Sequence, residues 1–376
     1  MAKKPIFAEV GTDTKVATAV TGAIEKSSGL ARVGFARWLW GLVVLIVIMI
    51  VIGGLTRLTD SGLSITEWDP VMGSIPPLST ADWVVAFDLY KGTSEYVLQN
   101  AGMTMDQFKV IYWWEWGHRQ LGRFIGLYWV IGFLIFLAMG RIPKQRMLAV
   151  FLIGPFTGLQ GVIGWLMVNS GLQGIRIDVV SYWLMTHLGA AFALLGYVAW
   201  QAQILGRSEA DLMQARRGRE AIATLASILV VFMFFQILMG ALVAGIDAGR
   251  NYTDWPLMAG GFLPPDLFAL DPWWRNFFED DGLVQFIHRM TAYALFAFGL
   301  FVGMRAAKSP NKQTRKAFAR VGLLLVAMMV IGVVTVMNSA PLHWAILHQF
   351  TGVLLWLAVV RGRFLASYPL VTSVRG

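Results

Sequence analysis

The 376-residue sequence contains no cysteine and few charged residues. The absence of cysteine excludes disulfide frameworks, thiolate metal sites, thiol nucleophiles and covalent haem attachment through a C-x-x-C-H motif. Charged residues make up 14% of the chain, against about 25% in ordinary soluble domains. Apolar residues are abundant instead: 57% are hydrophobic, 13% are aromatic and the mean hydropathy is +0.61, which excludes a disordered chain. The composition predicts an integral membrane protein.

Apolar runs long enough to cross a membrane, about 20 residues each, occur eight times. They occupy residues 36–56, 119–140, 147–168, 181–204, 221–246, 283–304, 319–338 and 341–360. The first run lies too deep in the chain for a signal peptide and has no small-residue cleavage pattern. The acidic residues Glu9, Asp13 and Glu25 before it argue against an organellar transit peptide. The predicted fold class is an all-α integral membrane protein with eight transmembrane helices.

The net charge of +9 is concentrated in short connections between the apolar runs. The connection between the second and third runs carries Arg141, Lys144 and Arg146 and no acid, whereas the long connections after the first and fifth runs are acidic. Basic short loops face the cytoplasm, so this pattern predicts that both termini are cytoplasmic and the long loops face outside. The charge therefore reports membrane topology, and nucleic acid is not an expected partner.

The chain also repeats itself in order. The segment GGLTRLTDSGLSITEWDPVMGSIPP from Gly53 matches GALVAGIDAGRNYTDWPLMAGGFLPP from Gly240, and VIGWLMVNS at Val162 matches VIGVVTVMNS at Val330. The repeat predicts two tandem pseudo-symmetric four-helix bundles related by an axis along the membrane normal. The predicted divisions are a cytoplasmic segment 1–35, an N-terminal half 36–204, a cytoplasmic linker 205–220, a C-terminal half 221–362 and a cytoplasmic tail 363–376.

Four of the five histidines fall on this repeat. His118 lies opposite His288, and His187 lies opposite His348, so each half has one histidine on its second helix and one on its fourth. All four lie in the outer part of their spans, and paired imidazoles at one depth suit the axial positions of a haem iron. Zinc is disfavoured because no third or fourth ligand accompanies either pair. The fifth, His343, has no partner and is interpreted as interfacial.

Charged neighbours differ between the two histidine sites. Glu115 precedes His118 by three residues and shares its helix face, whereas its counterpart before His288 is Gln285. This asymmetry favours chemistry that needs a base or a negative charge in the first half and a redox cofactor in the second; the alternative is that Glu115 is a solvated residue at the span boundary. Arg119 and Arg289 each follow a paired histidine and suit either contact with a haem propionate or snorkelling to the interface.

The motifs resemble those of the haem A synthase family. EWGHRQLGR, FIHRMTAY and LHQFTGVLLW join the two long outer motifs in this resemblance, which covers residues 36 to 362. It implies oxidation of a methyl group of haem O to a formyl group by successive hydroxylations, giving haem A for terminal oxidases. Some family members have paired outer-loop cysteines, so this chain resembles the cysteine-less branch.

The resemblance also implies roles for particular residues. His288 and His348 would be axial ligands of a haem b cofactor, His118 and His187 would hold the substrate haem, and Glu115 would be the essential acid. The implied location is the bacterial plasma (inner) membrane, as a multi-pass protein with its haem sites toward the outer face. Expected partners are haem O, membrane lipid, haem O synthase and an electron acceptor of unidentified class, and the oligomeric state stays open.

Two other functions fit parts of the pattern. A non-catalytic di-haem b electron-transfer cytochrome explains the histidines but gives Glu115 no role. A two-repeat transporter would need interrupted helices near the midplane, and Gly154–Pro155 in the third run is the only such break found. The outer loops, which contain Trp68, Trp255, Trp273 and Trp274, are predicted to cover the two haem sites.

Overall fold

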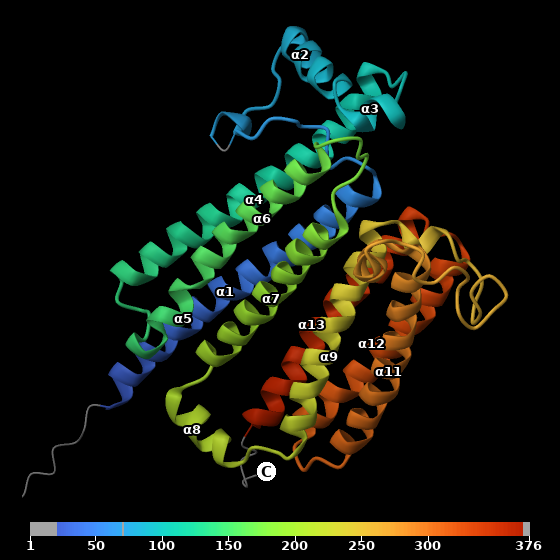
Figure 1. The fold of residues 1–376 in the computed structure, drawn as a ribbon. Helices are drawn as coiled ribbons and strands as arrows, with labels where there is room; N and C mark the ends of the chain where they lie inside the picture. Colours follow the sequence, from blue (N-terminus) through green and yellow to red (C-terminus); the bar gives the residue numbers. More distant parts are fainter. Residues whose placement is uncertain (1–20, 70, 371–376) are drawn as a thin grey trace, which may run out of the picture.

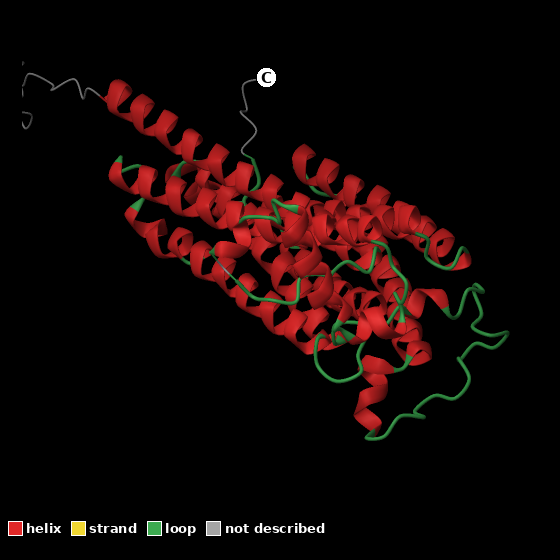
Figure 2. Ribbon diagram, turned by 90° about the horizontal axis from the view of Figure 1, so that it is seen from above, coloured by secondary structure: helices red, strands yellow, loops and turns green. Residues whose placement is uncertain are grey.

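The computed structural model describes residues 21–69 and 71–370, and this part of the chain contains helices and no strand (Figure 2). All eight predicted spans are confirmed as helices long and apolar enough to cross a membrane. They are α1 (Thr21–Leu58), α4 (Met105–Ala138), α5 (Met147–Phe151) with α6 (Ile153–Gly171), α7 (Ser181–Leu205), α9 (Ile222–Gly245), α11 (Asp281–Ala307), α12 (Lys312–Met337) and α13 (Leu342–Ser367). Helices dominate because lipid offers no partner to a free backbone N–H or C=O group.

The spans form two bundles that lie side by side (Figure 1). Helices α1, α4, α6 and α7 make the N-terminal half, and α9, α11, α12 and α13 make the C-terminal half. The halves meet where α7 packs against α9 and α13 and where α1 packs against α13, and α7 is the most buried of the spans. One apolar core runs through both halves, and the Trp356 indole of α13 crosses the boundary to donate to the Phe192 carbonyl of α7 at 2.9 Å.

Helix α4 begins well before its predicted span, so the segment before His118 extends the helix outward. Thr104 and Gln107 form a capping box there, in which each side chain pairs with the other residue's backbone N–H. This cap satisfies two of the free donors at the helix start. The aromatic side chains of the extension pack outside the membrane core against Phe87 and Tyr90 of α2.

The break at Gly154–Pro155 lies at the start of α6 and not at a midplane. Helix α5 ends at Phe151 and α6 starts at Ile153, which places Pro155 in the first turn of α6, where its missing N–H costs nothing. The matching span in the other half, α12, is continuous. The geometry lacks the paired midplane interruptions expected of a transporter.

The connections contain short helices. The outer loop of the N-terminal half holds η1 (Met72–Ser74), α2 (Thr80–Lys91) and α3 (Ser94–Leu98), and that of the C-terminal half holds η3 (Ala248–Arg250), η4 (Trp273–Arg275) and α10 (Asn276–Glu279). At the other end lie η2 (Lys144–Arg146) and α8 (Glu209–Arg217), the latter inside the predicted linker. Helix α13 continues into the predicted C-terminal tail, and residues 1–20 of the predicted N-terminal segment lie outside the described residues.

Candidate functional site

The four paired histidines each lie against a glycine of a neighbouring helix in the same half. A Cβ atom added to any of these glycines would come within 2.9 to 3.2 Å of the imidazole carbon Cε1, closer than side chains normally pack. The contacts are His118–Gly53, His187–Gly164, His288–Gly240 and His348–Gly332. Glycine therefore lets each imidazole sit against the next helix backbone, and the same arrangement occurs four times.

The histidines of each half face one another. The ring centroids of His288 and His348 are 6.5 Å apart and the rings are inclined by 72°. His118 and His187 are likewise within electrostatic range of each other. One iron bonded at about 2 Å to a nitrogen of each ring would span such a separation.

One histidine of each half has a glutamine at its Nδ1 atom. Gln236 of α9 places its amide nitrogen 3.0 Å from His288 Nδ1, and Thr291 holds the amide oxygen at 2.5 Å. Turned so that its nitrogen faces the ring, the Gln160 amide of α6 donates to His187 Nδ1 at 3.3 Å. These partners orient the ring, as outer-shell groups do for metal-binding histidines.

The other two histidines, His118 and His348, have buried Nδ1 atoms without a hydrogen-bond partner among the described residues. No group of three or more His, Asp or Glu side chains in the described part of the chain is arranged to hold a bare metal ion. Two facing imidazoles without a further protein ligand fit a haem, whose porphyrin supplies the remaining iron ligands. The donor set is therefore appropriate for haem and inappropriate for zinc.

Glu115 is buried, so the alternative that it is solvated at the span boundary is wrong. Its oxygen Oε2 accepts hydrogen bonds from the Ser64 hydroxyl and the Ile65 amide, both at 2.7 Å. Its other oxygen lies 2.6 Å from the Arg119 guanidinium. Donors at both oxygens therefore hold the Glu115 side chain in one orientation.

Gln285, the counterpart of Glu115, is buried to the same extent. Its amide nitrogen donates to the Ala248 carbonyl at 2.6 Å, while its oxygen has no partner among the described residues. The C-terminal site therefore has a neutral donor at the position where the N-terminal site has a negative charge. The predicted asymmetry is present in the structure as a difference in both charge and bonding.

Arg119 and Arg289 both hold the outer loop of their own half. Each guanidinium donates to backbone carbonyls at 2.7 to 3.1 Å. The accepting carbonyls are those of Ile65 and Glu67 for Arg119, and those of Tyr252, Asp254 and Leu257 for Arg289. Arg289 is only 7% exposed, so it does not snorkel to the interface. Contact with a haem propionate stays a prediction for both arginines.

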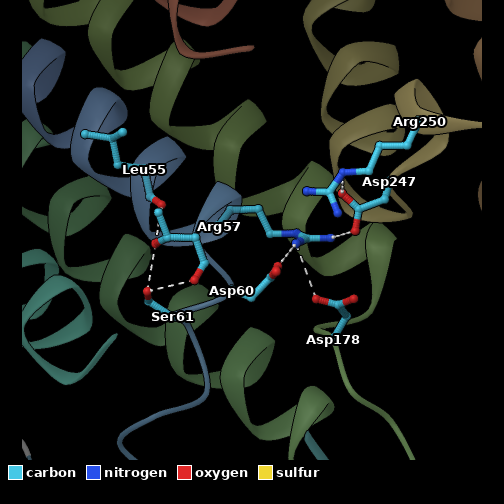
Figure 3. A network of polar contacts seen from close by, with 8 residues as sticks. Leu55, Arg57, Asp60, Ser61, Asp178, Asp247 and Arg250 are labelled. Atoms are coloured by element: carbon cyan, nitrogen blue, oxygen red, sulfur yellow. Dashed lines mark hydrogen bonds and ion pairs between the residues drawn. The ribbon is translucent and has the colours of Figure 1, made fainter. Parts of the chain in front are cut away.

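A cluster of charged side chains joins the two halves next to the histidine sites (Figure 3). Arg57 of α1 lies 3.0 Å from Asp60, 3.3 Å from Asp178 in the loop before α7, and 2.9 Å from Asp247 after α9. Arg250 contacts Asp247 from the other side at 3.6 Å. Burial raises the pKa of Asp178 and the Arg57 charge opposes that rise. One arginine thus binds three carboxylates from both halves.

The tryptophans of the outer loops contact the helices that carry the histidines or their neighbours. The Trp255 indole donates to the Tyr293 hydroxyl of α11 at 2.7 Å, and the Trp68 ring lies 6.2 Å from the Trp165 ring of α6. Coverage of the haem sites stays a prediction. His343 is exposed at the start of α13, beside Trp344, in keeping with an interfacial position.

Sequence reasoning missed the glutamines at the histidines and the role of Arg57. Gln160 and Gln236 carried one usable signal, since an amide inside an otherwise apolar span needs a partner. Arg57 carried no such signal in the sequence, because its partner Asp247 is far away along the chain and lies in the other half.

Comparison with known proteins identifies the family. A protein-family model described as cytochrome oxidase assembly protein (COX15-CtaA) matches residues 36–360. The chain is 55% identical over 377 residues to heme A synthase of Dinoroseobacter shibae, covering 100% of this chain and 98% of that protein. It is 53% identical over 377 residues to heme A synthase of Ruegeria pomeroyi, covering 100% and 99%. The chain therefore belongs to the COX15-CtaA family of cytochrome oxidase assembly proteins.

Proposed function

We propose that the protein is a haem A synthase, an oxidoreductase that converts a methyl group of haem O into the formyl group of haem A. The names of relatives similar over the whole chain support this activity. The structural observation that carries it is the pair of facing histidines in each half, with a buried carboxylate beside only one pair. Two haem sites with different surroundings suit a substrate site and a cofactor site.

In this proposal His288 and His348 would hold haem b, and His118 and His187 would hold haem O. Bound haem b supplies one-electron redox chemistry. Gln236 orients the His288 ring, and the four glycines keep the imidazoles against the helix backbones. Arg119 and Arg289 are the residues nearest to the histidines in sequence that offer forked donors to a propionate.

Glu115 acts at the substrate methyl. Oxidation of a methyl group removes electrons and develops positive charge on the carbon, which a water oxygen then captures. A buried carboxylate stabilises that charge or accepts a proton from the attacking water. Ser64, Ile65 and Arg119 hold the carboxylate in one orientation, so it needs no reorganisation during the step.

The proposed location is the bacterial plasma membrane, with both termini in the cytoplasm and the histidines toward the outer face. The basic short loops at one end of the bundle and the acidic long loops at the other support this orientation. The electrons released by the reaction must pass to an acceptor, and haem O is supplied by the enzyme that makes it.

Co-expression with a source of haem O tests the proposal. The purified protein is expected to contain haem b together with haem O or haem A, identified by mass after extraction. His288→Ala and His348→Ala should remove haem b, whereas His118→Ala and His187→Ala should remove the substrate haem, with His343→Ala as a matched control. Haem b alone, without conversion of added haem O, would instead indicate an electron-transfer cytochrome.

A further inference from the structure

A pocket lies between the two halves at the end of the bundle opposite the histidines. It has a volume of about 380 Å³, within the range of small-molecule sites. Its walls include Trp40 of α1, Gln203 of α7 and Leu357 of α13, and two arginines, Arg207 and Arg361, line it. Arg207 follows His187 by twenty residues of mostly helical chain, which places it about 30 Å further along the bundle.

The charges in this pocket are not neutralised by acids within it. Arg361 donates to the Gln203 side chain at 2.9 Å, and Arg207 donates to the Tyr368 carbonyl at 2.6 Å. Neither arginine forms a salt bridge within the described residues, and Asp211 on α8 is the acid within electrostatic range of Arg207. Arg361 also lies within range of Arg207 and Arg320, so like charges are gathered there.

We propose that this pocket binds the headgroup of an anionic phospholipid of the adjacent leaflet. Phosphate oxygens suit the forked donors of Arg207 and Arg361. The apolar walls, including the exposed ring of Trp40, accept the upper part of an acyl chain. Basic pockets between transmembrane helices are typical sites for such headgroups. The bound lipid would bridge α7 and α13, and so would stabilise the contact between the halves.

Thermal unfolding in detergent, with added phosphatidylglycerol or with phosphatidylcholine of the same chains, tests this site. Phosphatidylglycerol should raise the unfolding temperature, and native mass spectrometry should show it retained. The double variant Arg207→Gln/Arg361→Gln should bind it about 25-fold more weakly, since each of the two basic residues contributes about fivefold. Arg207→Lys/Arg361→Lys should retain most binding, and Arg216→Gln/Arg217→Gln on α8 is the control.

Equal stabilisation by phosphatidylcholine would overturn the proposal, because the neutral headgroup offers no net charge. Equal stabilisation by inorganic phosphate would assign the pocket to free anions and would also overturn it. Loss of binding in the α8 control would show that the effect is general surface charge.

A second inference comes from Glu95 on α3, which is independent of the pocket. Glu95 is 2% exposed, and its oxygen Oε2 has no hydrogen-bond partner among the described residues. Buried carboxyl oxygens are almost always paired, so an unpaired one needs an explanation. Ser94 next to it donates to the Gly174 carbonyl at 2.8 Å, which fixes α3 to the loop before α7.

Four other ionisable side chains lie near Glu95. Glu115 of α4, Tyr90 of α2, Asp60 after α1 and Asp178 before α7 all lie within its electrostatic range. Burial first, and then the charges of Glu115, Asp178 and Asp60, raise the pKa of Glu95 to about 8. Such a group exchanges protons readily near neutral pH.

We infer that Glu95 relays protons from the Glu115 site to the outer face, an inference that rests on the proposed function. When a methyl group and a water become a formyl group, protons and electrons are released in equal number, and the electrons leave to the acceptor. The protons arise beside Glu115, and Glu95 receives each one as a carboxylate and passes it outward. Glu95 is a buried carboxyl group within electrostatic range of both Glu115 and Asp178, and Asp178 is partly exposed.

The pH profile of haem O oxidation tests the relay. Only the carboxylate form of Glu95 accepts a proton, so the wild-type rate should rise with pH through about 8. Glu95→Gln should lower the rate by about tenfold or more and remove this limb. Glu95→Asp should restore part of it, and Asp88→Asn, an exposed acid on α2, is the control.

Infrared spectroscopy gives a readout that does not depend on activity. A carbonyl band of a protonated carboxyl group should disappear as the pH rises through about 8, and it should be absent in Glu95→Gln. If the band behaves in this way and the variant keeps the wild-type pH profile, the relay is wrong and the proposed function stands. If wild-type protein does not oxidise haem O at all, the proposed function fails first.

Discussion

The two halves of the molecule hold their histidines in the same way and differ in the residue one turn before. In both halves glycines receive the imidazoles, and an arginine after the first histidine binds outer-loop carbonyls. In the N-terminal half Glu115 pairs with Arg119, whereas in the C-terminal half Gln285 pairs with a backbone carbonyl and leaves Arg289 to the loop alone. One scaffold thus supports two electrostatic environments.

The outer loops widen this difference. The loop of the N-terminal half is partly helical and surrounds Glu95, and it forms its own apolar cluster with the start of α4. The loop of the C-terminal half is mostly irregular, and carboxylate–amide contacts such as those of Asp254 with Ala259 and Gly260 shape it. These backbone N–H groups lower the pKa of Asp254. The buried carboxyl group of Glu115 thus has only the amide of Gln285 opposite it in the C-terminal half, and the proposed chemistry takes place in the N-terminal half.

The largest expected effect comes from removing the carboxyl group of Glu115, which distinguishes the N-terminal half from the C-terminal half. Glu115→Gln should reduce haem A formation by about 10²–10⁴-fold while both haems remain bound, because the amide neither stabilises a cation nor accepts a proton. Extracted haems are quantified by mass. Gln285→Glu, the reverse change, should keep the activity within a few-fold. Near-normal product from Glu115→Gln would mean that the difference between halves is not catalytic.

Breaking the link between the halves should have the next largest effect. Arg57→Gln leaves three carboxylates without their shared cation. The free energy of unfolding should fall by about 1–3 kcal/mol and no more, since the acids are partly solvated. Arg250→Gln should lower the free energy of unfolding by less than Arg57→Gln does, because Arg250 is 44% exposed and contacts only one of these acids. Thermal unfolding of both variants measures this. Equal stability of the two variants would show that the cluster does not join the halves.

Adding a methyl group at the histidine contacts should affect the halves unequally. At Gly53 the new Cβ would lie 2.9 Å from the His118 ring, and at Gly240 it would lie 3.2 Å from the His288 ring. Gly53→Ala should therefore displace the His118 ring, at an energetic cost of about 1–3 kcal/mol, and lower haem retention several-fold. The loss of haem should be smaller in Gly240→Ala. Gly126→Ala, with open space around it, is the control. The haem content per protein molecule measures the effect of each of the three variants.

The smallest expected effect concerns Gln236. Gln236→Met removes the N–H group that faces His288 Nδ1. That N–H group withdraws electron density from the imidazole, so its loss should lower the reduction potential of haem b by tens of mV, from about 1 kcal/mol of hydrogen bonding. Gln160→Met changes the other half and should leave that potential unchanged. Redox titration of the haem b absorption band measures both variants. A shift from Gln160→Met alone would reverse the assignment of the two halves.

Much of the site followed from local sequence. The apolar runs defined the spans because lipid requires helices of a minimum length, and the rarity of histidine within them singled out the candidate haem ligands. The spacing of Glu115 from His118 placed them on one helix face without any knowledge of the fold. The burial of Glu115 did not follow, because the residues that cover it come from the loop after α1.

The sequence by itself determined eight helices, four candidate haem ligands and one carboxylate without a counterpart, since each depends on composition and helical periodicity within a single segment. Only the tertiary structure decided which glycine receives which histidine, that Gln236 faces His288, and that Arg57 binds Asp247 across the boundary between the halves. These contacts join segments far apart in the chain. Their formation depends on how two bundles pack, and helical periodicity within one segment carries no information about that packing.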